Sequence, residues 1–103
     1  MNVLYIDTSS NKEIKIGLQI DRKTYWLKRK ISYQKAQDVL PLIDKLLTSK
    51  KINLSEITGI YLVTGPGSFT GLRIGAVVAS TFGWLLDIPI NGKRQIVYPE
   101  YMS

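Results

Sequence analysis

Cysteine and histidine are both absent from this chain of 103 residues. Without cysteine the chain can form neither a disulfide bond nor a thiolate nucleophile. Without histidine it lacks the commonest metal ligand and the side chain best suited to proton transfer near neutral pH. These absences exclude much of enzyme chemistry, and we predict no catalytic residue, no metal site and no cofactor.

The sequence also shows no segment that we interpret as membrane-spanning or as a signal peptide. We identify no apolar run close to the roughly 20 residues that span a bilayer, and the first residues lack the basic and then apolar order of a signal peptide. We therefore predict a cytoplasmic protein with no membrane segment. Acidic residues are few, 8 against 14 lysines and arginines, so the formal charge of +6 favours attraction to nucleic acid or to an acidic protein surface, without choosing between them.

The length and the apolar content of 45% fit one compact domain, and its first third predicts three antiparallel strands. Residues 3–6 are a short apolar run followed by polar turn residues, and residues 14–20 alternate between apolar and other side chains. Residues 24–31 mix aromatic and β-branched side chains with lysine and arginine. A hairpin tip is predicted over residues 21–23.

The remaining pattern alternates helices with strands. Apolar residues three and four apart predict a helix over residues 38–47, in which Pro41 requires either a start near Asp38 or a kink. A buried strand is predicted over residues 59–63, and a second helix over residues 70–86.

The second predicted helix has Ser68 or Thr70 as its N-cap and Pro89 beyond its end. Residues 88–90 are expected to begin one more strand. This order of elements predicts an α/β domain of the ribonuclease-H-like kind, with a mixed sheet and helices on its faces. We place this domain at residues 1–92 and a C-terminal tail at residues 93–103.

Glycines are concentrated between the predicted strand and the second helix, from Gly65 to Gly75. Glycines that tolerate positive φ and a helix N-terminus together make a candidate anion site. The segment nevertheless fits neither phosphate fingerprint. Leu72 and Arg73 stand where the Walker pattern needs lysine and serine or threonine, and Thr70 stands where the dinucleotide pattern needs glycine. Tight packing of strand against helix is therefore the preferred interpretation, and phosphate binding is the alternative.

A ridge of small residues continues along the second helix, because Gly71, Gly75, Ala79 and Gly83 are each four residues apart. Glycine destabilises a helix interior by up to about 1 kcal/mol, so close packing against the ridge is the expected compensation. The element that packs there is equally well this domain's own sheet or first helix, or a helix of another protein.

Four segments of the chain, residues 6–9, 40–44, 65–75 and 88–92, together resemble the TsaB family. The resemblance extends over residues 3–92 in a single order. It implies an actin-like ATPase fold, which is built from two ribonuclease-H-like domains. It also implies a non-catalytic scaffold subunit that helps its partners install threonylcarbamoyl on a tRNA adenosine.

The same resemblance implies partners and a contact surface. TsaB proteins work with a TsaD-type catalytic subunit and a TsaE-type ATPase, contact tRNA indirectly, and form homodimers or heterodimers through their helices. Carried over to this chain, the two helices would be the contact surface. The predicted interface residues are Leu40, Ile43, Leu47, Gly71, Leu72, Gly75, Ala79 and Gly83.

Three departures from the family limit this expectation. The family's second domain has no counterpart after Gly92, so no nucleotide cleft between two domains is expected. Lys35, Ala36 and Gln37 stand where family members often carry a His-Ser-Glu run. The tail over residues 93–103 does not resemble the family's continuation.

Asp7 stands where actin-like ATPases place an aspartate that positions metal and phosphate. The preferred interpretation is that its carboxylate caps the turn formed by Thr8 and Ser9. The alternative is a nucleotide-binding remnant completed by dimerisation. For that alternative the candidate nucleotide or phosphate residues are Asp7, Thr8, Gly65, Gly67, Ser68 and Thr70.

The basic residues allow one further alternative, a small tRNA-binding module. Lys28, Arg29, Lys30 and Lys35 are close in sequence. Alternate residues of a strand point to opposite faces, however, so they do not form one patch by default. A solvated edge strand is the preferred interpretation.

Overall fold

A computed structural model describes residues 1–30 and 36–94 of the chain. Its centre is a four-stranded sheet in the order β3-β2-β1-β4, in which the pairs β1–β2 and β2–β3 are antiparallel and the pair β1–β4 is parallel. The predicted α/β fold with a mixed sheet is confirmed. The strands are β1 (Asn2–Asp7), β2 (Glu13–Ile20), β3 (Lys23–Lys30) and β4 (Gly59–Leu62).

Some predictions fall on residues that the structure does not describe. They are the end of the third strand at Ile31, the family position Lys35, and the tail from residue 95 onward.

The alternating pattern of β2 decides which face of the sheet is buried. Ile14, Ile16 and Leu18 are fully buried. Ile16 pairs in register with Ile6 of β1 and with Leu27 of β3. Because a shift of one residue would turn these apolar side chains toward solvent, the pattern specifies the pairing.

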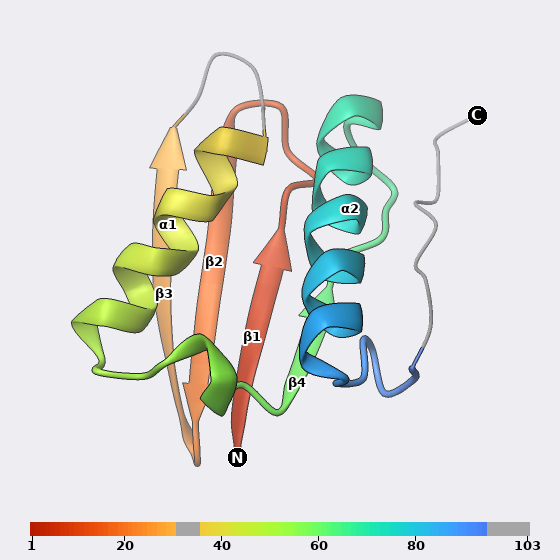
Figure 1. Ribbon diagram of the computed structural model, residues 1–103. Coiled ribbons are helices and arrows are strands. Elements are labelled where there is room, and N and C mark those ends of the chain that lie inside the picture. The colour runs from red at the N-terminus through yellow and green to blue at the C-terminus, as the bar shows by residue number, and fades with distance from the viewer. Residues whose placement is uncertain (31–35, 95–103) are drawn as a thin grey trace.

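Two α helices cover the same face of this sheet. Helix α1 (Ala36–Ser49) packs on β2 and β3, helix α2 (Phe69–Leu86) packs on β4 and β1, and a short 3₁₀ helix, η1 (Leu54–Glu56), lies between them in sequence. Figure 1 shows α1 and α2 on one side of the sheet. The prediction of helices on the faces of the sheet is thereby corrected, because the apolar sides of β1, β2 and β4 all point the same way.

Helix α1 begins at Ala36, two residues before its predicted start, and continues through Pro41. Pro41 lies beyond the first turn and is exposed. Lys51 ends the helix region with a left-handed φ of 56°, and the Ile52 N–H donates to the Leu47 carbonyl at 3.0 Å. The inward face consists of Val39, Leu42, Ile43, Leu46 and Leu47.

Helix α2 begins where a serine side chain caps it. The Ser68 Oγ accepts the N–H of Gly71 at 3.2 Å. Of the two predicted N-caps, Ser68 is therefore confirmed, and Thr70 lies inside the first turn. The helix ends at Asp87, which adopts the left-handed conformation with a φ of 53°.

The strand predicted over residues 88–90 is reduced to isolated bridges at Ile90, one of which joins it to Ile60 of β4. The Asn91 side chain, in place of a strand backbone, pairs with the backbone groups of Leu62 on β4. Its Oδ1 accepts the Leu62 N–H at 2.8 Å, and its Nδ2 donates to the Leu62 carbonyl at 3.0 Å. An amide side chain thus satisfies the backbone groups that a longer strand would pair.

Helix α2 also corrects the prediction about apolar runs. Its 18 residues are long and apolar enough to cross a membrane, judged by length and composition alone. In the structure 39% of this stretch is buried, and the helix packs on β1 and β4. We interpret α2 as the core helix of a two-layer domain.

Candidate functional site

The segments that carried the site predictions meet at one edge of the sheet. Strands β1 and β4 are parallel, so the loops that follow them emerge side by side. The Ser68 N–H donates to the Ser9 carbonyl at 2.7 Å. A Cβ atom at Gly67 would lie 2.5 Å from that same carbonyl oxygen, so the close approach of the two loops requires glycine there.

The hydroxyl groups near this edge are occupied by structural hydrogen bonds. Thr8 is fully buried, and its Oγ1 donates to the Gly71 carbonyl at 2.6 Å. Ser68 is the N-cap of α2. Of the candidate phosphate residues, Gly65 and Gly67 are half-buried and Thr70 is exposed in the first turn of α2.

Asp7 makes a local turn. Its Oδ1 accepts the Ser9 N–H at 3.0 Å and the Ser9 hydroxyl at 2.6 Å. This geometry is the turn cap that the sequence favoured over a nucleotide-binding role. No group of three or more Asp, Glu, His or Cys side chains that could hold a metal ion occurs within residues 1–30 and 36–94. Nucleotide binding at this edge stays the alternative interpretation.

The small-residue ridge of α2 faces the chain's own sheet. A Cβ atom at Gly75 would lie 2.3 Å from the Thr8 Oγ1, and one at Gly83 would lie 2.7 Å from the Ile90 Cδ1. Ala79 is fully buried between these positions. Small side chains therefore let α2 approach β1, β4 and the segment after the helix.

The predicted interface residues divide into two groups by burial. Leu40 on α1 is 44% exposed and lies at the surface. The others are covered by this chain's own packing and are not presented at its surface: Ile43, Leu47, Gly71, Leu72, Gly75, Ala79 and Gly83.

An apolar surface that was not predicted from the sequence lies on the outside of α2. Phe69, Val77, Trp84 and Leu85 are all more than half exposed, and Trp84 reaches 81%. At about 100° per residue Val77 and Trp84 fall on the side opposite the ridge, and Phe69 and Leu85 flank them, one on each side. The sequence did carry one indication of this surface, because the residues of α2 are apolar outside the ridge as well as along it. We call these four residues the outer apolar face of α2.

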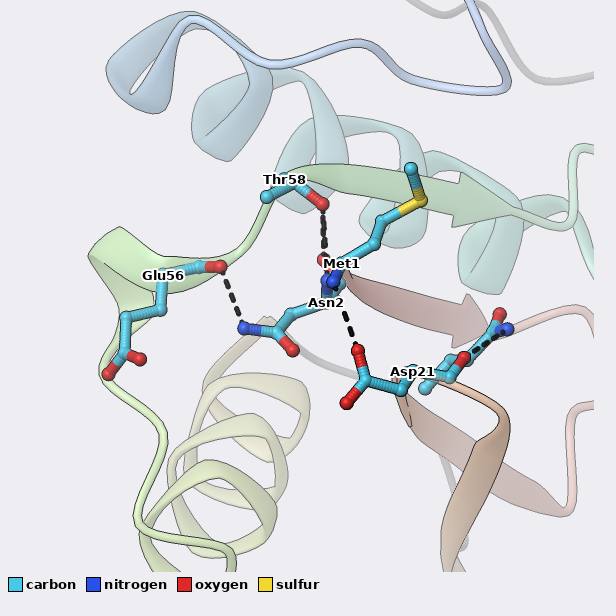
Figure 2. Close-up of polar contacts among 6 residues, drawn as sticks. Met1, Asn2, Asp21, Glu56 and Thr58 are labelled. Carbon is cyan, nitrogen blue, oxygen red and sulfur yellow. Dashed lines mark hydrogen bonds and ion pairs between the residues drawn. The ribbon is translucent and has the colours of Figure 1, made fainter.

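The start of β1 is tied to the rest of the fold by polar contacts (Figure 2). The Met1 ammonium group lies 3.4 Å from the Asp21 carboxylate, and both groups are exposed. The Asn2 Nδ2 donates to the Glu56 carbonyl at 3.0 Å, and the Asn2 backbone N–H donates to the Thr58 Oγ1 at 3.2 Å. These contacts hold β1 beside η1 and β4, and we assign them a structural role.

Comparison with known proteins identifies relatives of this chain. A family model described as TsaD, tRNA N6-adenosine threonylcarbamoyltransferase, matches residues 29–93. The tRNA threonylcarbamoyladenosine biosynthesis protein TsaB of Bacillus subtilis is 34% identical over 94 residues, and the match covers 88% of this chain and 40% of that protein. The TsaB protein of Buchnera aphidicola subsp. Schizaphis graminum is 32% identical over 90 residues, with coverage of 87% and 42%.

Solved structures agree with these matches. The structure titled YeaZ from Pseudomonas aeruginosa aligns with a TM-score of 0.81 at 29% identity, covering 87% of this chain and 43% of that chain. The mixed sheet with two helices is therefore the arrangement found in the corresponding part of that protein. This chain spans about two fifths of the length of the curated relatives that it matches.

Proposed function

Because the chain belongs to the TsaB family of tRNA threonylcarbamoyladenosine biosynthesis proteins, we propose that it is a non-catalytic scaffold subunit in this tRNA modification. In this role it binds a TsaD-type catalytic partner, or a second copy of itself, through its helices. A TsaE-type ATPase is a further candidate partner, tRNA is contacted indirectly, and the site of action is the cytoplasm.

The observation that supports this function most directly is the outer apolar face of α2. Trp84 is 81% exposed and Val77 is 63% exposed, seven residues apart on one side of the helix. Exposed tryptophan is enriched among the residues that dominate protein interfaces, and contiguous apolar helix surfaces mark contact sites. The Arg73 guanidinium lies 5.5 Å from the Phe69 ring centroid and adds a charged group to the same face.

The contact surface proposed here differs from the ridge in one respect. Gly75 and Ala79 are buried, so enlarging them would disturb the fold before it tested any partner. The outer apolar face and the exposed Leu40 are available to a partner without unfolding, since α1 and α2 share one side of the sheet (Figure 1).

Co-purification with a tagged TsaD-type catalytic subunit tests the scaffold function. Val77→Lys and Trp84→Lys should each weaken capture by about ten-fold or more, because a lysine ammonium would be buried in an apolar contact. Thr24→Lys is the matched control, since threonine has nearly the shape of valine and Thr24 is exposed on β3, away from the helices.

Calorimetric titration of this chain with the purified TsaD-type subunit should give similar affinities for the parent chain and Thr24→Lys, and lower affinities for Val77→Lys and Trp84→Lys. Capture that is equal for the parent chain, Val77→Lys and Trp84→Lys would refute the assignment of the contact to α2. Absence of any capture by the parent chain would refute the scaffold function itself.

A further inference from the structure

The face of the sheet turned away from α1 and α2 is not covered by any element within the described ranges, 1–30 and 36–94 (Figure 1). One row of this face is aromatic. Tyr5 of β1 pairs in register with Tyr61 of β4 and with Gly17 of β2, and Gly17 pairs with Trp26 of β3. The Tyr5 ring centroid lies 5.6 Å from that of Trp26 and 5.5 Å from that of Tyr61. We define the open sheet face as Tyr5, Lys15, Gly17, Trp26, Lys28 and Tyr61.

The aromatic rings of this row are held in place by contacts with the sheet, while two of them remain about half exposed to solvent. A Cβ atom at Gly17 would lie 2.7 Å from the Trp26 Cζ3, so the indole ring covers the glycine backbone. The Tyr5 hydroxyl donates to the Gln19 Oε1 at 2.8 Å. Trp26 and Tyr61 still expose 51% and 52% of their surface. Trp26 and Tyr61 lie on the two outer strands, with Tyr5 between them. Exposed aromatic rings on one face of a sheet are the means by which sheet surfaces stack nucleic-acid bases.

Positive charge lies beside this row. Lys15 and Lys28 stand directly opposite each other on β2 and β3, and like charges in that arrangement repel. The ion pairs found among the described residues neutralise neither of them. The Lys15 Nζ lies 5.6 Å from the Trp26 ring centroid, at the margin of the aromatic row. A bound phosphate group would remove the repulsion between the two lysines.

The acidic residues of the same face offset this charge only in part, because Lys15, Lys28 and Lys30 stand among two carboxylates, those of Asp7 and Glu13. Asp7 stands opposite Lys15 in register, but its Oδ1 accepts both hydrogen bonds from Ser9. Glu13 stands opposite a different lysine, Lys30.

We propose that the open sheet face binds single-stranded nucleic acid, with bases stacked on Trp26 and Tyr61 and phosphate groups beside Lys15 and Lys28. The charge decides between this occupant and an apolar protein segment, because a covering segment would bury two unpaired ammonium groups. A polyanion neutralises them and offers flat rings to the aromatic side chains. Binding at this face needs no partner protein, so its failure would leave the scaffold function untouched.

Fluorescence anisotropy of a labelled 12-nucleotide polyuridylate, and of its deoxythymidylate counterpart, tests this binding with the full chain. Binding of either oligonucleotide should weaken as salt rises from about 50 to about 200 mM. Trp26→Ala and Tyr61→Ala should each weaken it by about ten-fold. Lys28→Glu should weaken it several-fold and flatten the salt dependence. A preference for one oligonucleotide would identify RNA or DNA as the natural class.

Lys45→Glu is the matched control, because it makes the same change of charge on α1, on the other side of the sheet. It should leave the affinity nearly unchanged. If circular dichroism shows that Trp26→Ala does not fold, the oligonucleotide affinities of Tyr61→Ala and Lys28→Glu still test the proposal.

Any one of the following results would overturn the proposal: no binding of either oligonucleotide, equal losses from Lys45→Glu and Lys28→Glu, or full affinity in both aromatic variants. Dimerisation that Trp26→Ala abolishes, without oligonucleotide binding, would assign the face to a second copy of the chain and would also overturn it.

Discussion

Thr8, the residue after β1, packs directly against Gly75 of α2. Alanine in place of a helix glycine ordinarily stabilises a helix by about 1 kcal/mol. At Gly75 the added methyl group would lie 2.3 Å from the buried Thr8 Oγ1. That hydroxyl cannot move freely, because it donates to the Gly71 carbonyl at 2.6 Å. We therefore expect Gly75→Ala to lower the free energy of unfolding by roughly 1–3 kcal/mol, measured by urea denaturation.

The control for this prediction is a double-mutant cycle with Thr8→Ala, which removes the nearest atom. The next neighbour of the added methyl group is the Leu62 Cδ1 at 3.2 Å, the end of a flexible side chain. In the Thr8→Ala background, Gly75→Ala should therefore cost less than it does in the parent chain. Additive effects of the two substitutions would show that this contact does not limit the approach of the helix.

At the scale of the element, the N-terminus of α2 depends on one hydroxyl group. The Ser68 Oγ accepts the Gly71 N–H at 3.2 Å, whereas Thr70 lies exposed in the first turn. Ser68→Ala should lower the free energy of unfolding by about 1 kcal/mol. Thr70→Ala, which was an equal candidate from sequence, should change it by less than about 0.5 kcal/mol. Thermal and urea unfolding measure both, and equal losses would contradict the assignment of the cap.

The elements differ in how well the sequence predicted them, and the reasons are physical. The strands of the first hairpins and the helix positions follow from periodicity, since alternation and spacing of three or four report one buried face directly. The segment at residues 88–90 did not become a strand, because the side chain of Asn91 occupies the pairing groups of Leu62. Local pattern carries no information about such a long-range hydrogen bond.

The candidate site was harder to predict for a related reason. The small-residue ridge was visible in the sequence, but its spacing fits an internal neighbour and an external one equally well. Only the structure, which places Gly75 against Thr8 and Gly83 against Ile90, shows that the ridge packs internally. The aromatic row escaped detection because Tyr5, Trp26 and Tyr61 come from three separate strands and meet only through register.

The molecule as a whole has two chemically different sides. On the side of the sheet that α1 and α2 cover (Figure 1), the outer apolar face of α2 is exposed. On the other side the open sheet face carries aromatic rings and lysines. A protein partner and a nucleic acid could then occupy opposite sides of the four-stranded sheet at the same time. This separation makes the two proposed contacts independent of one another.

A matched pair of tryptophan substitutions tests that independence. Trp84→Ala on α2 should weaken capture of the TsaD-type subunit by about ten-fold and leave oligonucleotide affinity unchanged, and Trp26→Ala on β3 should do the reverse. Both remove the same side chain from an exposed position, so a general loss of stability would affect both assays in both variants. Loss of both contacts by either variant, in a chain that remains folded by circular dichroism, would show that the two faces are coupled through the sheet between them.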